Sequence, residues 1–239
     1  MLYIISGFLF GLLIPYLARR IGKLIPASSG YILLKIFVPS HYMPWAKLKN
    51  NEAYMELFRR YFMRSIGWAI FTSAATILFA LNFDTIFTWW YIAFLWILLL
   101  LVEVDKRFML LPDILTLPLL LLGFAYAAKQ GFWLIIPEPY FITCAANSAL
   151  GAISGYLMPL IASLFVVWKY PEAFGDGDIK LLSAIGAWVG FAAMPYILLG
   201  SCLLFAAGWM INKRKIGPFG PAIVYATLIF VIFAFAALS

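Results

Sequence analysis

The stretch IFTWWYIAFLWILLLLVEVDKRFMLLPD (residues 86–113) begins as a long apolar run and then turns abruptly to charge. An uninterrupted apolar run of about 18 residues or more predicts a transmembrane helix. Asp105 directly follows the run that we predict as a helix over 86–104. A second aspartate, Asp178, lies in FGDGDIKLL (residues 174–182), where we expect another short polar break. Carboxylates at the edge of a bilayer are costly and usually mark function, so these two acids are the first candidates for a site.

The composition of the whole chain excludes a soluble domain. Of the 239 residues, 65% are hydrophobic and only 11% are charged. We therefore predict an all-α polytopic membrane protein with about eight transmembrane helices and one larger cytoplasmic loop. The expected helices cover residues 2–18, 66–83, 86–104, 114–129, 141–168, 181–191, 194–211 and 219–238. The first run starts apolar and carries its positive charge afterwards, which favours a permanent helix over a secretory signal peptide.

The charges divide the chain into three expected parts. Residues 1–18 form a first transmembrane helix, and residues 19–65 form a basic cytoplasmic loop that contains no cysteine. Residues 66–239 form a membrane-embedded domain that holds both aspartates. If the N-terminus lies outside and the helices alternate, all but Lys129 of the 17 lysines and arginines lie inside, as the positive-inside rule requires. This orientation also places Asp105 and Asp178 on the same, cytoplasmic, face.

The residue types available to a site exclude a metal centre. Cys144 and Cys202 both lie in apolar runs, where cysteine usually acts as a small buried hydrophobe. The single histidine, His41, cannot build a zinc site alone. Two aspartates need no metal, because neighbouring carboxylates cannot both ionise cheaply and so share a proton. Such a pair activates water in aspartic proteases.

Each motif also has a purely structural interpretation. A Gly-Asp repeat at a helix end is commonly a turn or an N-cap. Leu111-Pro112-Asp113 suits the start of a helix, and Asp105 could simply pair with the neighbouring Lys106 or Arg107. The glycines Gly175 and Gly177 would also let the backbone approach a substrate strand. Lys180 either makes a polar contact near the site or extends to the lipid headgroups.

The two motifs together resemble the type IV prepilin peptidases. The resemblance rests on VDKRFMLLPDILTLPLL, on FGDGDIKLLSAIGAWVG and on IGPFGP (residues 216–221), and it covers roughly residues 95–239. It implies that Asp105, seven residues before Pro112, and Asp178, which closes Gly-x-Gly-Asp, are the catalytic pair. Residues 66–239 would then be an aspartic peptidase domain. The implied supporting or substrate-binding residues are Glu103, Asp113, Gly175, Asp176, Gly177 and Lys180.

The resemblance also implies a substrate and a location. Members of this family sit in the bacterial inner membrane with the site on the cytoplasmic face. They remove the basic leader of type IV prepilin or pseudopilin precursors after a Gly. Lipids and these precursors are the expected partners, and nucleic acid is not. Six acids near the two motifs suggest an acidic mouth for the leader: Glu103, Asp105, Asp113, Glu172, Asp176 and Asp178.

The family implies a second activity that this sequence leaves open. Proteolysis should need no cofactor, whereas many members also methylate the new N-terminus with S-adenosylmethionine. Many have two Cys-x-x-Cys pairs in the first cytoplasmic loop, and residues 19–65 have no cysteine. Structural zinc would supply much of the folding energy of such a loop, so methylation is expected to be weak or absent.

Two other classes of protein remain open. In the first, Asp105 and Asp178 are relay carboxylates of an ion- or proton-coupled transporter. The lack of an internal repeat and of charges in mid-helix argues against it. The second is a non-enzymatic assembly protein of a pilus or secretion system, and the intact aspartates with their flanking glycines argue against that.

Overall fold

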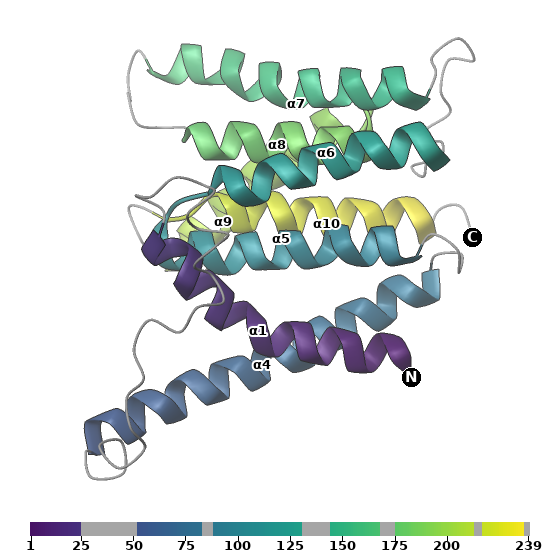
Figure 1. Cartoon of the computed structure of the whole chain (residues 1–239). Coiled ribbons are helices and arrows are strands. Elements are labelled where there is room, and N and C mark those ends of the chain that lie inside the picture. The colour runs from purple at the N-terminus through teal and green to yellow at the C-terminus, as the bar shows by residue number, and fades with distance from the viewer. Residues whose placement is uncertain (25–51, 83–87, 131–143, 168–174, 213–216, 237–239) are drawn as a thin grey trace. The chain divides into compact units, whose positions relative to one another are not determined.

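The computed structural model describes residues 1–24, 52–82, 88–130, 144–167, 175–212 and 217–236. Within these ranges the regular structure is entirely helical (Figure 1). The helices are α1 (Leu2–Leu24), α4 (Glu52–Asn82), α5 (Thr88–Phe108), α6 (Asp113–Gln130), α7 (Cys144–Val167), α8 (Asp176–Val189), α9 (Met194–Asn212) and α10 (Gly220–Ala236). The prediction of an all-α polytopic membrane protein is confirmed.

Five of the described helices are long and apolar enough to cross a membrane. Their candidate spans are Leu2–Leu24, Phe58–Leu81, Thr88–Phe108, Cys144–Leu164 and Met194–Ile211, and Gly220–Ala234 is a shorter apolar helix. Helix α8 has only 14 residues. It is therefore too short to cross a hydrocarbon layer of about 30 Å by itself, in agreement with the expectation of a short helix at residues 181–191.

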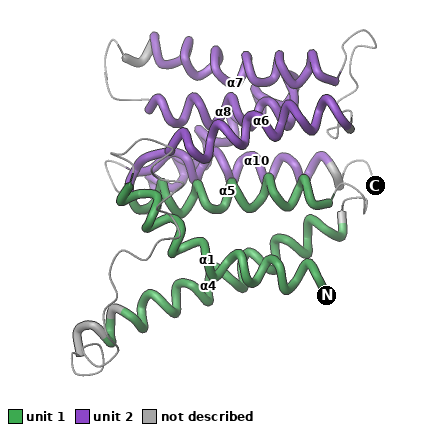
Figure 2. Tube along the Cα trace, in the orientation of Figure 1, with its two compact units in different colours: residues 1–107 green, residues 108–239 purple. Residues whose placement is uncertain are grey.

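The chain divides into two compact units, residues 1–107 and 108–239 (Figure 2). In the first unit, α1 and α4 run antiparallel. Gly11 packs directly on the backbone of Ala69, and Ser73 donates a hydrogen bond to the Ile4 carbonyl (3.3 Å). Helix α5 joins α4 through Trp96, whose Nε1 donates to Thr76 Oγ1 (3.0 Å). These contacts bring the C-terminal ends of α1 and α5 to the N-terminal half of α4.

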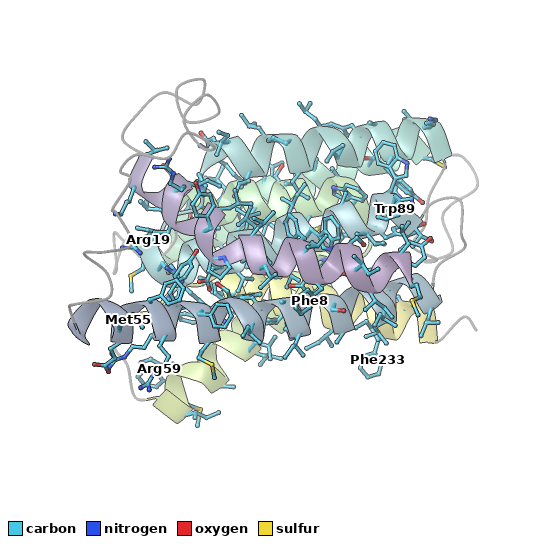
Figure 3. All side chains as sticks on the ribbon, turned by 60° about the horizontal axis from the view of Figure 1, so that its bottom comes forward. Phe8, Arg19, Met55, Arg59, Trp89 and Phe233 are labelled. Carbon is cyan, nitrogen blue, oxygen red and sulfur yellow. The ribbon has the colours of Figure 1, made fainter. Side chains whose placement is uncertain are left out.

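One end of the first unit is therefore basic. Figure 3 shows Arg19 and Arg59 toward one end of these helices and Trp89 toward the other. This basic end also includes Lys106 and Arg107, which lie in the last turn of α5. A one-sided distribution of this kind is what the positive-inside rule predicts for helices that cross a bilayer.

In the second unit, α8 packs between α6 and α7. It runs parallel to α6, because Trp188 Nε1 donates to the Leu119 carbonyl (2.8 Å) near one end and Lys180 reaches Asp113 near the other (2.7 Å). It runs antiparallel to α7, where Ser148 donates to the Ala187 carbonyl (2.6 Å). Helices α9 and α10 form an antiparallel pair whose rings stack, as Tyr196 does on Phe230.

Several helix boundaries differ from those predicted. The expected loop at residues 19–65 is shorter at both ends, because α1 continues to Leu24 and α4 already begins at Glu52. No proline interrupts residues 52–65, and Arg60 pairs with Glu56 one turn away, so the charged segment can remain helical. Residues 25–51, which include His41, lie outside the described residues.

The two aspartates also lie within helices, where the sequence had suggested polar breaks. Asp105 is in the last turn of α5 and Asp178 is in the first turn of α8. The reason is local. Asp and Gly are compatible with a helical first turn, and the basic residues Lys106 and Arg107 are favourable in a last turn. In α5, the charged residues end the apolar run before the helix itself ends. In α8, the helix begins with charged residues before its apolar part.

Candidate active site

The N-terminus of α8 holds the second aspartate. Gly175 is the N-cap residue (φ −78°, ψ 141°), and its carbonyl accepts the Asp178 amide (3.0 Å). Asp176 and Asp178 both lie in the first turn, where unpaired amides and the helix dipole favour negative charge. A Cβ at position 175 would lie 3.2 Å from Asp178 Oδ2. Glycine at 175 therefore keeps space beside this carboxylate.

The loop before α6 lies directly on this turn. A Cβ at Gly177 would lie 2.8 Å from the Leu111 Cβ and 3.3 Å from the Leu111 carbonyl oxygen. Lys180 Nζ donates to both oxygens of Asp113, at 2.7 and 2.9 Å. The structure thus brings together four of the predicted supporting residues, Gly175, Gly177, Asp113 and Lys180. Their role within the second unit is to hold residues 111–113 against the turn that carries Asp178.

The first aspartate lies in a buried turn of α5. Asp105 is 4% exposed, and Glu103, two residues earlier, is completely buried. Helix α5 ends at Phe108, and Met109 then adopts a left-handed backbone (φ 50°), a conformation that residues other than glycine rarely adopt. The turn that holds Asp105 is therefore the last helical turn of α5, just before this left-handed residue.

Glu103 is held by three side chains of the first unit. Oε1 accepts from Arg107 Nε (2.6 Å) and pairs with Arg64 Nε (3.0 Å). Oε2 accepts from Arg64 Nη2 and Trp68 Nε1, each at 3.0 Å. A buried carboxylate with this number of donors supports the helix packing and is not open to a substrate.

The ion pairs change which acids can form the expected acidic mouth. Glu103 is neutralised inside the first unit, and Asp113 is paired with Lys180. Asp176 is exposed and Asp178 is half-buried at the start of α8. Glu172 lies outside the described residues. Within the described part of the chain, the first turn of α8 thus carries two acids of the second unit, Asp176 and Asp178.

The described residues offer no ligand set for a metal. Within the described ranges, no group of three or more His, Cys, Asp or Glu side chains is close enough to hold an ion. Cys144 is partly buried, whereas Cys202 is exposed on α9. The interpretation of Cys202 as a buried small hydrophobe is wrong, because its helix presents most of its surface outward.

A close helix contact supports α8 from the opposite side. Cβ atoms at Gly151 or Gly186 would run into the backbone of the other helix, and a Cβ at Gly155 would meet the Leu182 carbonyl. Ser183 Oγ also donates to the Ala152 carbonyl (2.9 Å). Small residues thus form the face of α7 that packs on α8. It lets α8 approach α7 at backbone distance, the usual use of small residues in membranes.

Sequence reasoning missed the partners of Glu103. Arg64 and Trp68 lie 39 and 35 residues away in the chain, and Arg64 had been included in a loop. The available signal was their spacing of four residues, which places both on one face of a helix. That signal becomes useful only once α4 is known to extend back to Glu52.

Comparison with known proteins identifies the family. The sequence pattern described as the type IV leader peptidase family matches residues 92–211, which is half of the chain and includes both aspartates. The prepilin leader peptidase/N-methyltransferase of Aeromonas salmonicida is 37% identical over 141 residues, covering 55% of this chain and 44% of that protein. The protein of the same name from Dichelobacter nodosus is 33% identical over 162 residues, covering 66% and 53%.

A third relative, of the same name, comes from Neisseria gonorrhoeae. It is 31% identical over 130 residues, which cover 53% of this chain and 42% of that protein. The chain thus matches about half the length of these curated relatives. No solved structure matches it. The match over residues 92–211 includes both aspartate motifs, α6, α8 and α9, and on this ground the chain belongs to the type IV leader peptidase family.

Proposed function

We propose that this chain is a membrane aspartic endopeptidase that removes the basic leader of type IV prepilin or pseudopilin precursors. Asp105 and Asp178 are its catalytic pair. The scissile bond follows a Gly at the end of the leader. The proposal rests on the family match and on the chemistry of two acids that the same family segment includes.

One observation carries the assignment of the pair. Leu111 follows Asp105 by six residues in the chain, and it packs on Gly177, next to Asp178. The Lys180–Asp113 ion pair holds the same loop at a second point. These contacts tether the chain segment after Asp105 to the turn that carries Asp178, which supports their joint action. The close approach of Leu111 also gives a structural reason for glycine at position 177.

The chemistry follows from the division of one proton between two carboxylates. The ionised aspartate takes a proton from water, and the water oxygen attacks the scissile carbonyl carbon. The protonated aspartate donates a hydrogen bond to the carbonyl oxygen and stabilises the charge that develops there. The carbon–nitrogen bond then breaks, and the departing nitrogen receives the proton that the initially ionised aspartate took from water. Asp178 suits the ionised role because it lies at a helix N-terminus.

We place the protein in the bacterial inner membrane with the site on the cytoplasmic side. In the first unit, the basic ends of α1 and α4 lie toward the same side, and the Arg64–Glu103 pair brings the basic end of α5 to α4. In the second unit, Lys180 lies at the N-terminal end of the parallel helices α6 and α8, and Lys129 lies at the other end of α6. The basic end of the first unit supports the assignment of the Asp105 end to the cytoplasm. The described residues of the second unit have one lysine at each end and do not distinguish the two sides.

The names of the relatives include N-methyltransferase as a second activity. For this chain we propose that cleavage does not depend on methyl transfer. No residue of the dyad chemistry requires S-adenosylmethionine. Residues 19–65 contain no cysteine that could bind zinc, so we expect methyl transfer to be weak or absent.

The test is incubation of the purified full chain with a pilin precursor that has a basic leader, Gly before the scissile bond and Phe after it. Intact mass reports both activities. A product that lacks exactly the leader, formed without S-adenosylmethionine, is the expected result. An uncut precursor would reject the peptidase proposal, and a product one methyl group heavier with S-adenosylmethionine would reject the expectation on methylation.

A further inference from the structure

The Glu103 network joins two helices at the level of Asp105. Arg64 and Trp68 belong to α4, and Arg107 belongs to α5. Glu103 is 1% exposed at its side chain, Arg107 is 19% and Arg64 is 47% exposed. The carboxylate is therefore withdrawn from solvent, while one guanidinium reaches the edge of the unit.

Stability alone is a weak explanation for this network. An ion pair in a buried environment loses hydration free energy that its Coulomb attraction often only offsets, and apolar residues of similar size would commonly pack as well. The two helices are also joined farther along by the Trp96–Thr76 hydrogen bond. An apolar contact has no preferred direction, so it permits a helix to rotate about its own axis.

Helix geometry links this direction to Asp105. Residues two apart differ by about 200° around a helix axis. When Glu103 faces α4, Asp105 therefore points to the opposite side of α5. A slip of one residue would turn the Asp105 side chain by about 100°. The Glu103–Arg107 pair also spans Asp105 within the turn that ends before Met109, so it resists fraying of this last turn.

We propose that Glu103, together with Arg64, Trp68 and Arg107, is a positioning group that sets the direction of the Asp105 carboxylate. This inference rests on the proposed role of Asp105 in peptide hydrolysis. Glu103 itself touches no substrate. It acts by fixing the rotation of α5 against α4.

The α4–α5 interface provides a matched pair of variants. Trp68→Phe removes the hydrogen bond to Glu103 and keeps a ring, and Trp96→Phe removes the corresponding bond to Thr76 at the same interface but remote from Asp105. Arg64→Leu breaks the buried pair, and Arg60→Leu breaks the exposed Arg60–Glu56 pair one turn away on the same helix.

The kinetic arm uses the full chain and the precursor described above. We expect Glu103→Leu, Arg64→Leu and Trp68→Phe each to lower kcat about tenfold or more, with KM within about twofold, because small misplacements of a reacting group are costly. Trp96→Phe and Arg60→Leu should keep kcat within about twofold. Equal losses of kcat in Trp68→Phe and Trp96→Phe, or an unchanged kcat in Glu103→Leu, would overturn the inference.

A second arm does not depend on activity. In a background with Cys144→Ser and Cys202→Ala, a single cysteine is placed at position 105 or 106, and its reaction with a water-soluble maleimide is timed. Asp105 is buried and Lys106 is exposed, so we expect slow labelling at 105 and fast labelling at 106. Addition of Glu103→Leu should reduce the ratio of the labelling rate at 106 to that at 105 at least about threefold, because α5 is then free to rotate. An unchanged ratio overturns the positioning role even if no precursor is cleaved, whereas a changed ratio without any cleavage by the wild type rejects only the proposed function.

Discussion

At the residue scale, the decisive feature is that each aspartate lies in the terminal turn of a helix. Asp178 lies where α8 begins and Asp105 lies where α5 ends. The local fields differ, because a helix N-terminus favours negative charge and a C-terminus opposes it. Two chemically identical side chains are thus given unequal surroundings, which is the requirement for one acid and one base.

Gly177→Ala tests the contact that holds residues 111–113 on the α8 turn. The new Cβ would lie 2.8 Å from the Leu111 Cβ and 3.3 Å from its carbonyl. We expect a loss of about 1–3 kcal/mol in stability and a fall in precursor cleavage, because the loop must move. Thermal unfolding and initial rates measure the two effects.

Gly67→Ala is the control for this substitution, because a Cβ there would meet nothing within 4 Å. It should leave both quantities nearly unchanged. Full stability and full activity of Gly177→Ala would show that the close approach of Leu111 is not required.

The sequence alone predicted the two aspartates and the glycines around Asp178, since their spacing is local. It could not predict that Glu103 accepts hydrogen bonds from Arg64 and Trp68, because these residues lie in a different helix. The number of acids near the two motifs therefore overestimated the negative charge that the expected acidic mouth would carry. Only tertiary contacts show which carboxylates are already neutralised.

At the element scale, α8 is a short helix that depends on its neighbours. It has 14 residues, and residues from Ile179 to Val189 are largely buried against α6 and α7. Its side chains reach neighbouring backbones through Trp188 and Ser183, and its glycine Gly186 lies at backbone distance from Gly151. An element of this length gains its stability from packing, because isolated helices of about 12–15 residues are marginal.

Gly186→Ala should therefore disrupt the second unit. The added methyl group would overlap the Gly151 carbonyl, and no flexible side chain can move aside. We expect about 3 kcal/mol of destabilisation, the upper part of the range for overpacking. The midpoint of thermal unfolding in detergent measures it.

Gly208→Ala serves as the comparison, because a Cβ at this mid-helix position of α9 has open space around it. This variant should be as stable as the wild type or more so, since alanine is the better helix former. Equal midpoints for the two variants would contradict the close α7–α8 contact.

The helix boundaries show where sequence patterns were sufficient and where they failed. The apolar runs located every described helix. They placed the start of α8 at residue 181 and the start of the second long helix at residue 66, whereas the helices begin at Asp176 and Glu52. In both places polar residues continue a helix beyond its apolar part. Hydrophobicity marks the portion that can be buried, and backbone hydrogen bonding decides the full length.

At the scale of the whole molecule, the distribution of charge predicts the orientation in the membrane. All but Lys129 of the 17 basic residues fall in segments assigned to one side. The described helices of the first unit agree with this, since α1, α4 and α5 share a basic end. This orientation can be predicted from the sequence because the positive-inside rule depends on composition and order and not on tertiary contacts.

Tags inserted along the full chain test this topology. Insertions near residues 45, 174 and 214 should report a cytoplasmic location, and insertions near residues 84 and 134 a periplasmic one. Protease accessibility in intact and opened spheroplasts distinguishes them. If the segment after Asp105 and the segment before Asp178 were accessible from opposite sides, the two aspartates could not act on one peptide bond.

The central claim is that Asp105 and Asp178 act as one catalytic unit, and the most direct test is the cleavage rate of Asp105→Asn and Asp178→Asn. Each variant is compared with the wild type at matched amounts of folded protein in the membrane, on the same leader-bearing precursor. An amide can neither take a proton from water nor share one with a partner. Each single substitution should therefore lower the rate by about 10³-fold or more, and the double variant should lose little beyond that. Processing at the wild-type rate by either single variant would contradict the account.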